Sequence, residues 1–384
     1  MKYLFAFFIL SFNIHAEVLP VAARLEGAGT SLGAIYKTQN NNHEYLLGAS
    51  VLDIKVIGGL YQFRLNNNLK IFVGGLLLKD LNFETSYLRG LQDDNDNKYT
   101  QNLDITAISM GAEYEIINKS LFLKFNTTKS TVEFGDYSID SEKIDLPGAN
   151  LFDVETLNIG LNLEFKLEDD RKEKGLLLSS GFNQLSGRKG QSDHLLTNFT
   201  LALKYPIIES VIFKFKALRS TAVASSSKYD KESEVRDALG VDCSGISNSS
   251  KRSECEKLEN NLVQYIAAHN KYGTANAIGG SAGLRSFREQ RFKAQNNQVT
   301  LTELAFRLSD YLNSTLFTKD RSLDLVSFYD TGYASDEKSE LMDKHLYSRG
   351  VGLNINSENN TVMLQYSEGS YDSNAWFLSV GKSF

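Results

Sequence analysis

The last ten residues of the chain alternate between two kinds of side chain and end on an aromatic residue. One series is mainly large and apolar, and consists of Trp376, Leu378, Val380, Lys382 and Phe384. The interleaved series is mostly small or polar, and consists of Phe377, Ser379, Gly381 and Ser383. Successive residues of a β-strand point to opposite faces, and in a membrane barrel the apolar face points outward to lipid. The pattern therefore predicts the closing strand of an outer-membrane β-barrel.

The beginning of the chain has the composition of a secretory signal peptide. Lys2 gives a positive start, residues 3–12 are an almost unbroken apolar run, and Ala16 is a small residue suited to cleavage before Glu17. We expect residues 1–16 to be the signal peptide and residues 17–26 to be a short periplasmic segment. No later stretch approaches the roughly 18 continuous apolar residues of a membrane-spanning helix.

Alternation of the same kind recurs along the chain, most clearly over residues 157–167. One face there is apolar, with Leu157, Ile159, Leu161, Leu163, Phe165 and Leu167. The other face suits a wet interior, with Asn158, Gly160, Asn162, Glu164 and Lys166. A charged turn at 168–174 and a return strand at 175–182 follow. Short turns of this type are expected at the periplasmic end of a barrel.

Further segments have the length and pattern of strands: 27–37, 44–52, 54–65, 69–78, 83–91, 103–116, 121–134, 195–205, 211–222, 299–308, 323–333, 348–356 and 361–367. With the two strands above and the closing strand the tally is sixteen, and bacterial barrels have even strand numbers. We therefore expect an all-β fold, a transmembrane antiparallel β-barrel of sixteen strands over residues 27–384. The tally leaves no room for a separate periplasmic domain.

Residues 225–296 are the largest departure from tight turns, and we expect them to form a long extracellular loop. Ser253 and Glu256 have capping-box spacing, apolar residues follow at helical spacing, and Gly273 is placed to end the helix. This helix either folds over the barrel mouth or offers a surface to a partner. Cys243 and Cys255 lie close together in an exported chain, which favours a disulfide between them.

Other chemistry finds little support in the sequence. The net charge of −6 argues against a nucleic-acid binder. His43, His194, His269 and His345 are scattered without the spacing of a zinc site, and we expect them to be surface or girdle residues. We expect no metal, no cofactor and no enzymatic activity. A Ser/His/Asp group assembled from distant strands remains the alternative.

Five ordered stretches near the C-terminus carry a family resemblance. They are residues 278–289 (Ile-Gly-Gly-Ser-Ala-Gly-Leu-Arg-Ser-Phe-Arg-Glu), 302–307 (Thr-Glu-Leu-Ala-Phe-Arg), 328–332 (Phe-Tyr-Asp-Thr-Gly), 349–353 (Arg-Gly-Val-Gly-Leu) and 380–384 (Val-Gly-Lys-Ser-Phe). This series resembles the loop and strand signatures of the bacterial surface antigen superfamily of outer-membrane barrels. That superfamily includes the outer-membrane protein assembly factor, the translocation and assembly module barrel and the two-partner-secretion transporters.

The alternation assigns faces to the residues of these stretches. Phe328, Asp330 and Gly332 share one face, opposite Leu325 and other apolar residues, so Asp330 should point into the lumen. A carboxylate facing lipid would cost a few kcal/mol at the bilayer midplane, which supports this assignment. By the same reasoning Glu303 faces the lumen.

The resemblance implies that the sixth extracellular loop folds back into the lumen. Gly279, Gly280 and Phe287 belong to the loop motif, and Arg285 would then be held bidentately by Asp330, with Glu303 as a second acceptor. We call Arg285, Glu303 and Asp330 the latch. It either only plugs and rigidifies the barrel or takes part in a mechanism. Ser286 stands where the family has glycine, so we expect strain at the loop tip if a positive φ is required there.

Two functions follow from the resemblance and its limits. The first is an insertase-like or translocase-like barrel that assists the insertion or export of polypeptides without a periplasmic capture domain of its own. The second is a passive, plugged barrel or partner scaffold. Expected partners are outer-membrane lipid and either unfolded polypeptide clients or a separate periplasmic protein, with no nucleic acid. The expected location is the outer membrane of a Gram-negative bacterium.

Overall fold

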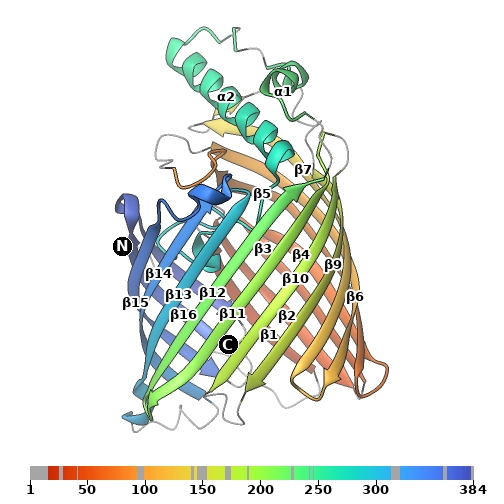
Figure 1. The fold of residues 1–384 in the computed structure, drawn as a ribbon, viewed down its shortest axis with the longest axis vertical. Helices are drawn as coiled ribbons and strands as arrows, with labels where there is room; N and C mark the ends of the chain where they lie inside the picture. The colour runs from red at the N-terminus through yellow and green to blue at the C-terminus, as the bar shows by residue number, and fades with distance from the viewer. Residues whose placement is uncertain are drawn as a thin grey trace.

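The computed structural model describes residues 16–25, 29–40, 42–92, 99–139, 142–144, 154–168, 174–187, 190–225, 229–241, 243–244, 246–312, 321–357 and 361–381. Within them the chain forms one antiparallel sheet of seventeen strands that curves into a barrel wall (Figure 1). The expected signal peptide lies almost wholly outside the described residues, as does Phe384.

The strands follow one another along the chain with short turns at one end of the barrel. The first nine are β1 (Ala16–Leu25), β2 (Gly29–Asn40), β3 (His43–Leu52), β4 (Lys55–Arg64), β5 (Leu69–Thr85), β6 (Tyr99–Ile117), β7 (Leu121–Ile139), β8 (Glu142–Ile144) and β9 (Val154–Glu168). The others are β10 (Gly175–Gly187), β11 (His194–Ile208), β12 (Val211–Ala224), β13 (Asn296–Arg307), β14 (Arg321–Ser335), β15 (Leu346–Ser357), β16 (Thr361–Gly369) and β17 (Asn374–Gly381). Each long strand pairs with its neighbours in sequence, and the short β8 pairs with β7, which also pairs with β9.

The expected count of sixteen strands is not reproduced, because the described sheet has seventeen, one of them the three-residue β8. Two of the expected segments are also assigned wrongly. Residues 17–26, expected to be a periplasmic segment, lie almost entirely in β1, which pairs with β2 from Ala16 opposite Thr38 to Leu25 opposite Gly29. The expected strand at 83–91 does not exist as a unit. Its first residues continue β5 past a register shift between Leu78 and Leu81, and the remainder is a loop. An irregularity of this kind interrupts the period of two and makes one long strand read as two.

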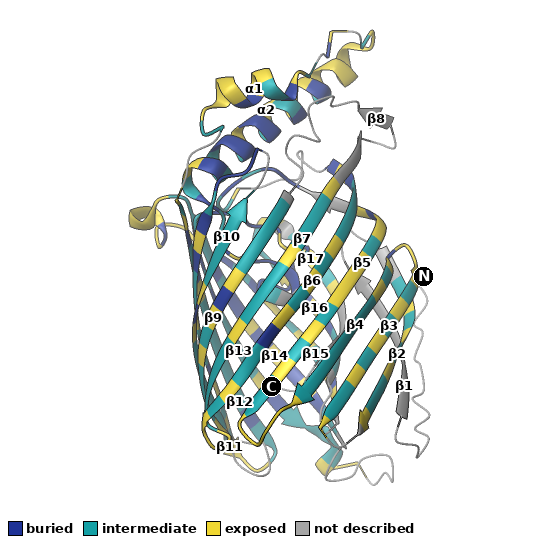
Figure 2. Ribbon diagram, turned by 90° about the vertical axis from the view of Figure 1, so that its right-hand side faces the viewer, coloured by how far each residue is buried: buried dark blue, intermediate teal, exposed yellow. Residues whose placement is uncertain are grey.

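Apolar side chains point outward from the wall, as the alternation in the sequence predicts. On β9, Leu161 and its outward neighbours are exposed, while on β14 Leu325 and Tyr329 are exposed and Phe328 and Asp330 are buried (Figure 2). The apolar positions of a soluble protein would point the other way. The exposed apolar wall is therefore the lipid-facing surface of a barrel.

Two helices lie above the barrel mouth within the long loop between β12 and β13 (Figure 1). The second, α2 (Ser249–Tyr272), contains the predicted helix and ends before Gly273 as expected. Its start was predicted wrongly, because the side chain of Asn248, rather than that of Ser253, caps the helix by accepting from two backbone N–H groups. The first, α1 (Glu232–Leu239), was not predicted.

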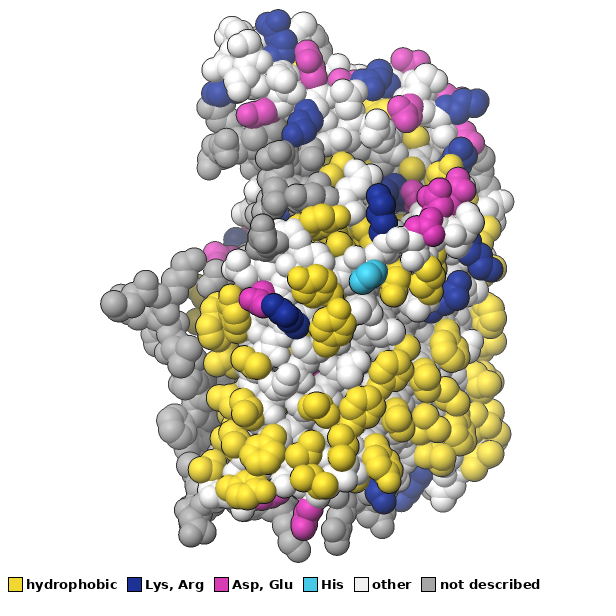
Figure 3. Space-filling model, turned by 60° about the vertical axis from the view of Figure 1, so that its left-hand side comes forward, with side chains coloured by type: hydrophobic (Ala, Val, Ile, Leu, Met, Phe, Trp, Pro, Cys, Tyr) yellow, Lys and Arg dark blue, Asp and Glu magenta, His cyan; other side chains and the backbone are white. Residues whose placement is uncertain are grey.

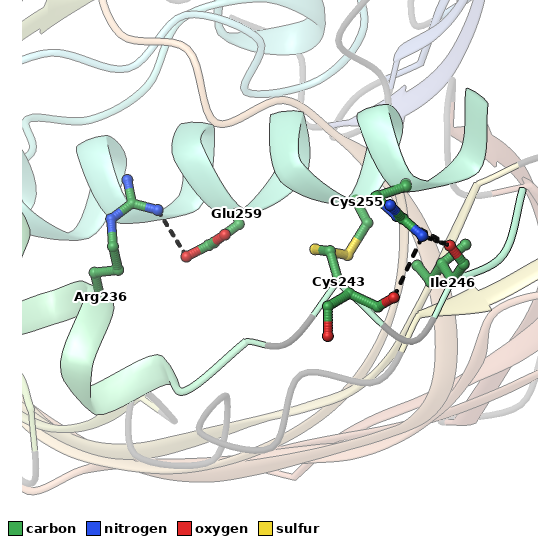
Figure 4. The surroundings of a disulfide bond; sticks show 7 residues. Arg236, Cys243, Ile246, Cys255 and Glu259 are labelled. Carbon is green, nitrogen blue, oxygen red and sulfur yellow. Dashed lines mark hydrogen bonds and ion pairs between the residues drawn. A yellow bond between two sulfur atoms is a disulfide. The ribbon is translucent and has the colours of Figure 1, made fainter. Parts of the chain in front are cut away.

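A disulfide and a compact apolar cluster make α1 and α2 one unit, which we call the cap. Cys243 and Cys255 are joined, as predicted, and Arg236 of α1 pairs with Glu259 of α2 at 2.7 Å (Figure 4). The cluster joins apolar residues of both helices to a tyrosine in the loop after β5 and to the first residue of β6: Val235, Leu239, Leu258, Leu262, Val263, Ile266, Ala267, Tyr87 and Tyr99. The apolar side of α2 is therefore buried locally, against α1 and the two tyrosines.

None of the helices in the described part of the chain combines the length and the hydropathy needed to cross a membrane.

The lipid-facing assignment predicts that the cost of a charge depends on depth. Leu161→Arg, in the middle of β9, should destabilise the barrel by about 2–4 kcal/mol, and Leu167→Arg, near the end of the same face, by at most about 1 kcal/mol. Equilibrium unfolding in lipid vesicles measures both values. Equal costs at the two positions would contradict the assignment.

Candidate functional site inside the barrel

Residues 278–292, which we call the plug segment, turn back into the lumen after the cap. Their two ends are tied by a pair of backbone hydrogen bonds between Ile278 and Phe292, of 2.9 and 3.0 Å. The turn between them uses positive φ at Gly279 (126°) and Gly280 (65°). A side chain at Gly279 would lie 2.6 Å from the carbonyl oxygen of Arg288, so the glycine is needed there both for conformation and for space.

Apolar contacts fix the plug segment to the inner wall. Its members pack as one cluster with residues of β13, β14 and β15: Ile278, Leu284, Phe287, Phe292, Ala294, Val299, Ala334 and Leu346. Gly332 makes this approach possible, because a methyl group there would lie 2.5 Å from Cδ1 of Leu284. The segment is therefore seated by shape before any charge is considered.

The three residues of the latch meet in the structure. Arg285 donates to both carboxylate oxygens of Asp330, from Nε at 2.9 Å and from Nη2 at 2.8 Å, and its Nη1 reaches Glu303 at 3.3 Å. The side chain of Asp330 is fully buried, and that of Arg285 is 8% exposed. The fork of the guanidinium thus faces the carboxylate in the bidentate arrangement that gives both strength and orientation.

Neighbouring groups complete the surroundings of Arg285. The guanidinium lies 3.5 Å from the ring centroid of Phe328, on the ring face that attracts cations. Gln365 of β16 accepts from Nη1 at 3.0 Å, and Ser367 donates to the backbone carbonyl of Arg285 at 2.8 Å. Three strands, β13, β14 and β16, therefore contribute to holding Arg285.

The charges of this buried group balance. Lys214 of β12 donates to Glu303 at 2.8 Å, so Glu303 lies between two cations, Lys214 and Arg285. With Asp330 the group contains two positive and two negative charges. A buried ion pair is tolerable only when its charges and hydrogen bonds are satisfied, and here they are.

Ser286 is not strained, which corrects the expectation for this position. It is not among the non-glycine residues with positive φ. Its hydroxyl lies 2.6 Å from the Ser348 hydroxyl and 2.9 Å from that of Ser373. Gly369 supplies the space, because a Cβ there would collide with the Ser286 hydroxyl. The absence of a side chain at Gly369 thus leaves room for the Ser286 hydroxyl.

Sequence reasoning missed several residues of the site. Lys214, Gln365 and Ser367 each lie on the inward-facing series of a strand, which is the only signal they carry. Trp376, from the predicted closing signature, is not part of the site and stands exposed on the outer face against Tyr366 at 5.2 Å.

Two histidines expected to be isolated are in contact at the barrel mouth. The rings of His194 and His269 lie edge to face with centroids 4.6 Å apart, and both belong to the junction between α2 and the wall.

Nearby Arg89 forms a bidentate pair with Asp336 at 2.7 and 2.5 Å. Burial, and then the cations of Arg288, Arg291 and Arg89, lower the pKa of Lys293 to about 7.

Among the described residues, no group of three or more His, Cys, Asp or Glu side chains is arranged to hold a metal ion. The latch has the geometry of a positioning contact, since each carboxylate is engaged by a cation.

Comparisons with known proteins show the fold. No protein-family model and no curated protein sequence matches the chain. Among solved structures, CdiB from Escherichia coli has a TM-score of 0.61 at 10% identity, with 98% of this chain and 64% of that chain covered. BamA from Haemophilus ducreyi lacking POTRA domains 1–3 has a TM-score of 0.53 at 8% identity (96% and 70% covered). CdiB from Acinetobacter baumannii has a TM-score of 0.54 at 11% identity (96% and 60% covered).

The chain thus spans less than two thirds of the length of either CdiB structure and shares its barrel fold. This likeness agrees with the outer-membrane barrel fold that the sequence predicts.

The buried charge balance predicts a large asymmetry between single and double substitutions. Arg285→Ala leaves Asp330 buried without its cation and should destabilise the barrel by about 3–5 kcal/mol. The double change Arg285→Met with Asp330→Leu removes both charges while Lys214 still pairs with Glu303, and should recover much of that loss. Urea unfolding in vesicles measures the difference.

Arg349→Ala is the matched control, because Arg349 and Glu368 form an ion pair that is exposed on the outer surface. It should leave unfolding unchanged. Equal destabilisation by the single and double changes would show that Arg285 contributes packing and not charge.

Proposed function

We propose that the protein is a barrel of the outer membrane of a Gram-negative bacterium that assists the insertion or export of other polypeptides. Its partners in this role are outer-membrane lipid and unfolded polypeptide clients, delivered directly or by a separate periplasmic protein. The plug segment, held by the latch, controls the lumen. The sheet junction between β1 and β17, which we call the seam, is where the wall opens.

The observation that carries the proposal is the weakness of the seam. Within the described residues, β1 and β17 are paired at one position, Arg24 opposite Leu378. On the other side of each strand the ladder is long, from Ala16 to Leu25 for β1 and from Asn374 to Gly381 for β17. Strand edges with unused N–H and C=O groups are templates for an added strand. An incoming chain can therefore be accepted there with little loss of existing pairing.

The outer surface near the seam supports the same role. On β9 six successive outward positions are apolar, whereas β13 presents Thr300 and Thr302 outward, and Thr300 contacts Thr331 of β14. On β15 and β16, Arg349 and Glu368 form an exposed ion pair. On the side that carries these strands, hydrophobic side chains gather in the lower part, and charged ones lie above them and along the lower edge (Figure 3).

A shorter apolar band thins the surrounding bilayer, at a cost of a fraction of a kcal/mol per Å of mismatch. Lipid that is already thinned offers a lower barrier to an inserting strand. The thinned side includes β15 and β16, which lead directly to β17 and the seam.

Stapling the seam tests this function. Arg24→Cys with Leu378→Cys should form a disulfide across the seam, and the control Leu353→Cys with Leu364→Cys should staple β15 to β16 at a position of equivalent register. The assay is the folding rate of a urea-unfolded outer-membrane barrel into liposomes that contain the protein.

The wild type and the control staple should accelerate folding over empty liposomes, and the seam staple should not. Adding reductant should restore the seam variant and leave the control unchanged, which also controls for reduction of Cys243–Cys255. Equal acceleration by both staples, or none by the wild type, would contradict the proposal.

A passive, plugged barrel is the second candidate, and the complete satisfaction of the latch favours it. Every charge of the latch is paired, and Ser286 adds further contacts to the wall. In this function the plug segment would remain in place permanently.

Conductance tests the plug in either function. Wild-type protein in planar bilayers should conduct little, Arg285→Ala should raise the conductance by freeing the plug segment, and Arg349→Ala should not. A large wild-type conductance that Arg285→Ala leaves unchanged would show that the segment does not block the lumen.

A further inference from the structure

The junction between the cap and the barrel contains groups that the proposed function does not use. The last turn of α2 reaches the loop between β10 and β11, where Asn270 is fully buried. Asn270 accepts from the backbone N–H of Ser192 at 3.0 Å and donates to the carbonyl of Gly190 at 3.0 Å. This one side chain therefore fixes the end of α2 to the wall.

His269 precedes Asn270 and is enclosed by the same junction. Its ring lies edge to face with His194, the first residue of β11, and stacks on Tyr265 with centroids 6.0 Å apart. Nε2 of His194 is buried and has no hydrogen-bond partner among the described residues. A second proton placed on Nε2 of His194 would therefore find no acceptor among the described residues.

A hydrogen-bond chain connects Arg89 to His269 and is compatible with a neutral ring. Arg89 donates to the hydroxyl of Thr274 at 2.8 Å, and that hydroxyl lies 2.7 Å from Nδ1 of His269. The hydroxyl, having accepted from the guanidinium, can direct its own proton to Nδ1, which accepts it only when the ring is neutral.

The charged groups around the pair are predominantly cationic. Arg89 and Lys293 both lie over the ring of Tyr265, at 5.9 and 5.6 Å, and Asp336 is engaged by Arg89. Arg288 and Arg291 act on Lys293 from the plug segment side. Asp193 faces His194 from the loop and also accepts from the backbone N–H of Gly187 at 2.9 Å. A proton added to His269 therefore meets more repulsion than attraction.

We propose that His269 and His194 form a pH-sensitive joint: the cap is docked on the barrel mouth at neutral pH and is released as the medium becomes acidic. The joint regulates access to the extracellular end of the lumen. It is independent of whether the barrel inserts, exports or merely plugs.

The sign of the pH dependence follows from the burial of His269. Burial, and then His194 and Arg89, hold the pKa of His269 well below its ordinary value of 6.5. The C-terminal end of a helix favours a cation, but that attraction is outweighed here. Above about pH 6.5 both docked and released states are neutral, so His269 adds no pH dependence. Below that pH the released state binds a proton that the docked state does not, and docking weakens.

Lys293 acts in a different pH range and can be separated from the histidines. Its pKa is lowered from 10.5 to about 7 in the docked state. The released state therefore holds the extra proton only between these two values, so docking strengthens as the pH rises through the alkaline range. Below neutral pH both states of Lys293 are protonated and it adds no further slope.

Hydrogen exchange of the full-length protein in lipid nanodiscs, between about pH 5 and 8, tests the joint. Exchange is corrected for its intrinsic pH dependence, with β9 and β10 as the internal reference. The opening constant of residues 258–272 should rise by up to tenfold per pH unit below about pH 6.5 for each histidine that becomes protonated. His269→Gln should flatten that slope, and His194→Gln should reduce it.

His345→Gln is the matched control, because His345 lies exposed on the loop between β14 and β15. It should keep the wild-type slope. If His269→Gln loosens the cap at every pH, the slope still reports on the proton. A wild-type opening constant that does not change with pH, or an unchanged slope in His269→Gln, would overturn the proposal.

Discussion

A cation buried inside a barrel must be neutralised there, and the rest of the site follows from that requirement. Arg285 leaves the extracellular loop and lies beside the fully buried Asp330, whose distance along the chain is 45 residues. Glu303 and Lys214 complete a neutral group. A buried charge without its partner is costly, so moving the plug segment away from the wall would leave charges unpaired on both sides. The location of the plug segment and the arrangement of the wall from β12 to β16 are therefore coupled.

Small residues decide where this coupling is possible. Gly332 admits Leu284 of the plug segment, and Gly369 admits the hydroxyl of Ser286. The contact between Ser286 and Gly369 is instructive, because the serine at the position of the family glycine had suggested strain. Ser286 instead occupies space that Gly369 leaves open, so the close approach of loop and wall is kept with a serine at the loop position.

The same barrel combines a firmly held interior with a weakly held edge. The latch is buried and fully paired, whereas β1 and β17 meet at one position among the described residues. The plug segment and the seam thus differ in how many paired contacts hold them, and the cap lies apart from both. The cap is joined to the barrel through Asn270 and the two histidines, and it can respond to its surroundings without disturbing the latch.

Period-two alternation let the sequence by itself determine the barrel, most of its strands and the inward direction of Asp330 and Glu303, because side-chain direction in a strand is a local property. The nearness of Cys243 and Cys255 likewise gave the disulfide. Only the tertiary structure brought Gln365, Lys214 and the pair of His194 and His269 into contact, and only it placed residues 16–25 in the wall. Gln365 lies 80 residues from Arg285, and such partners are set by the register of the strands in the wall and the path of the loop, which no local pattern encodes.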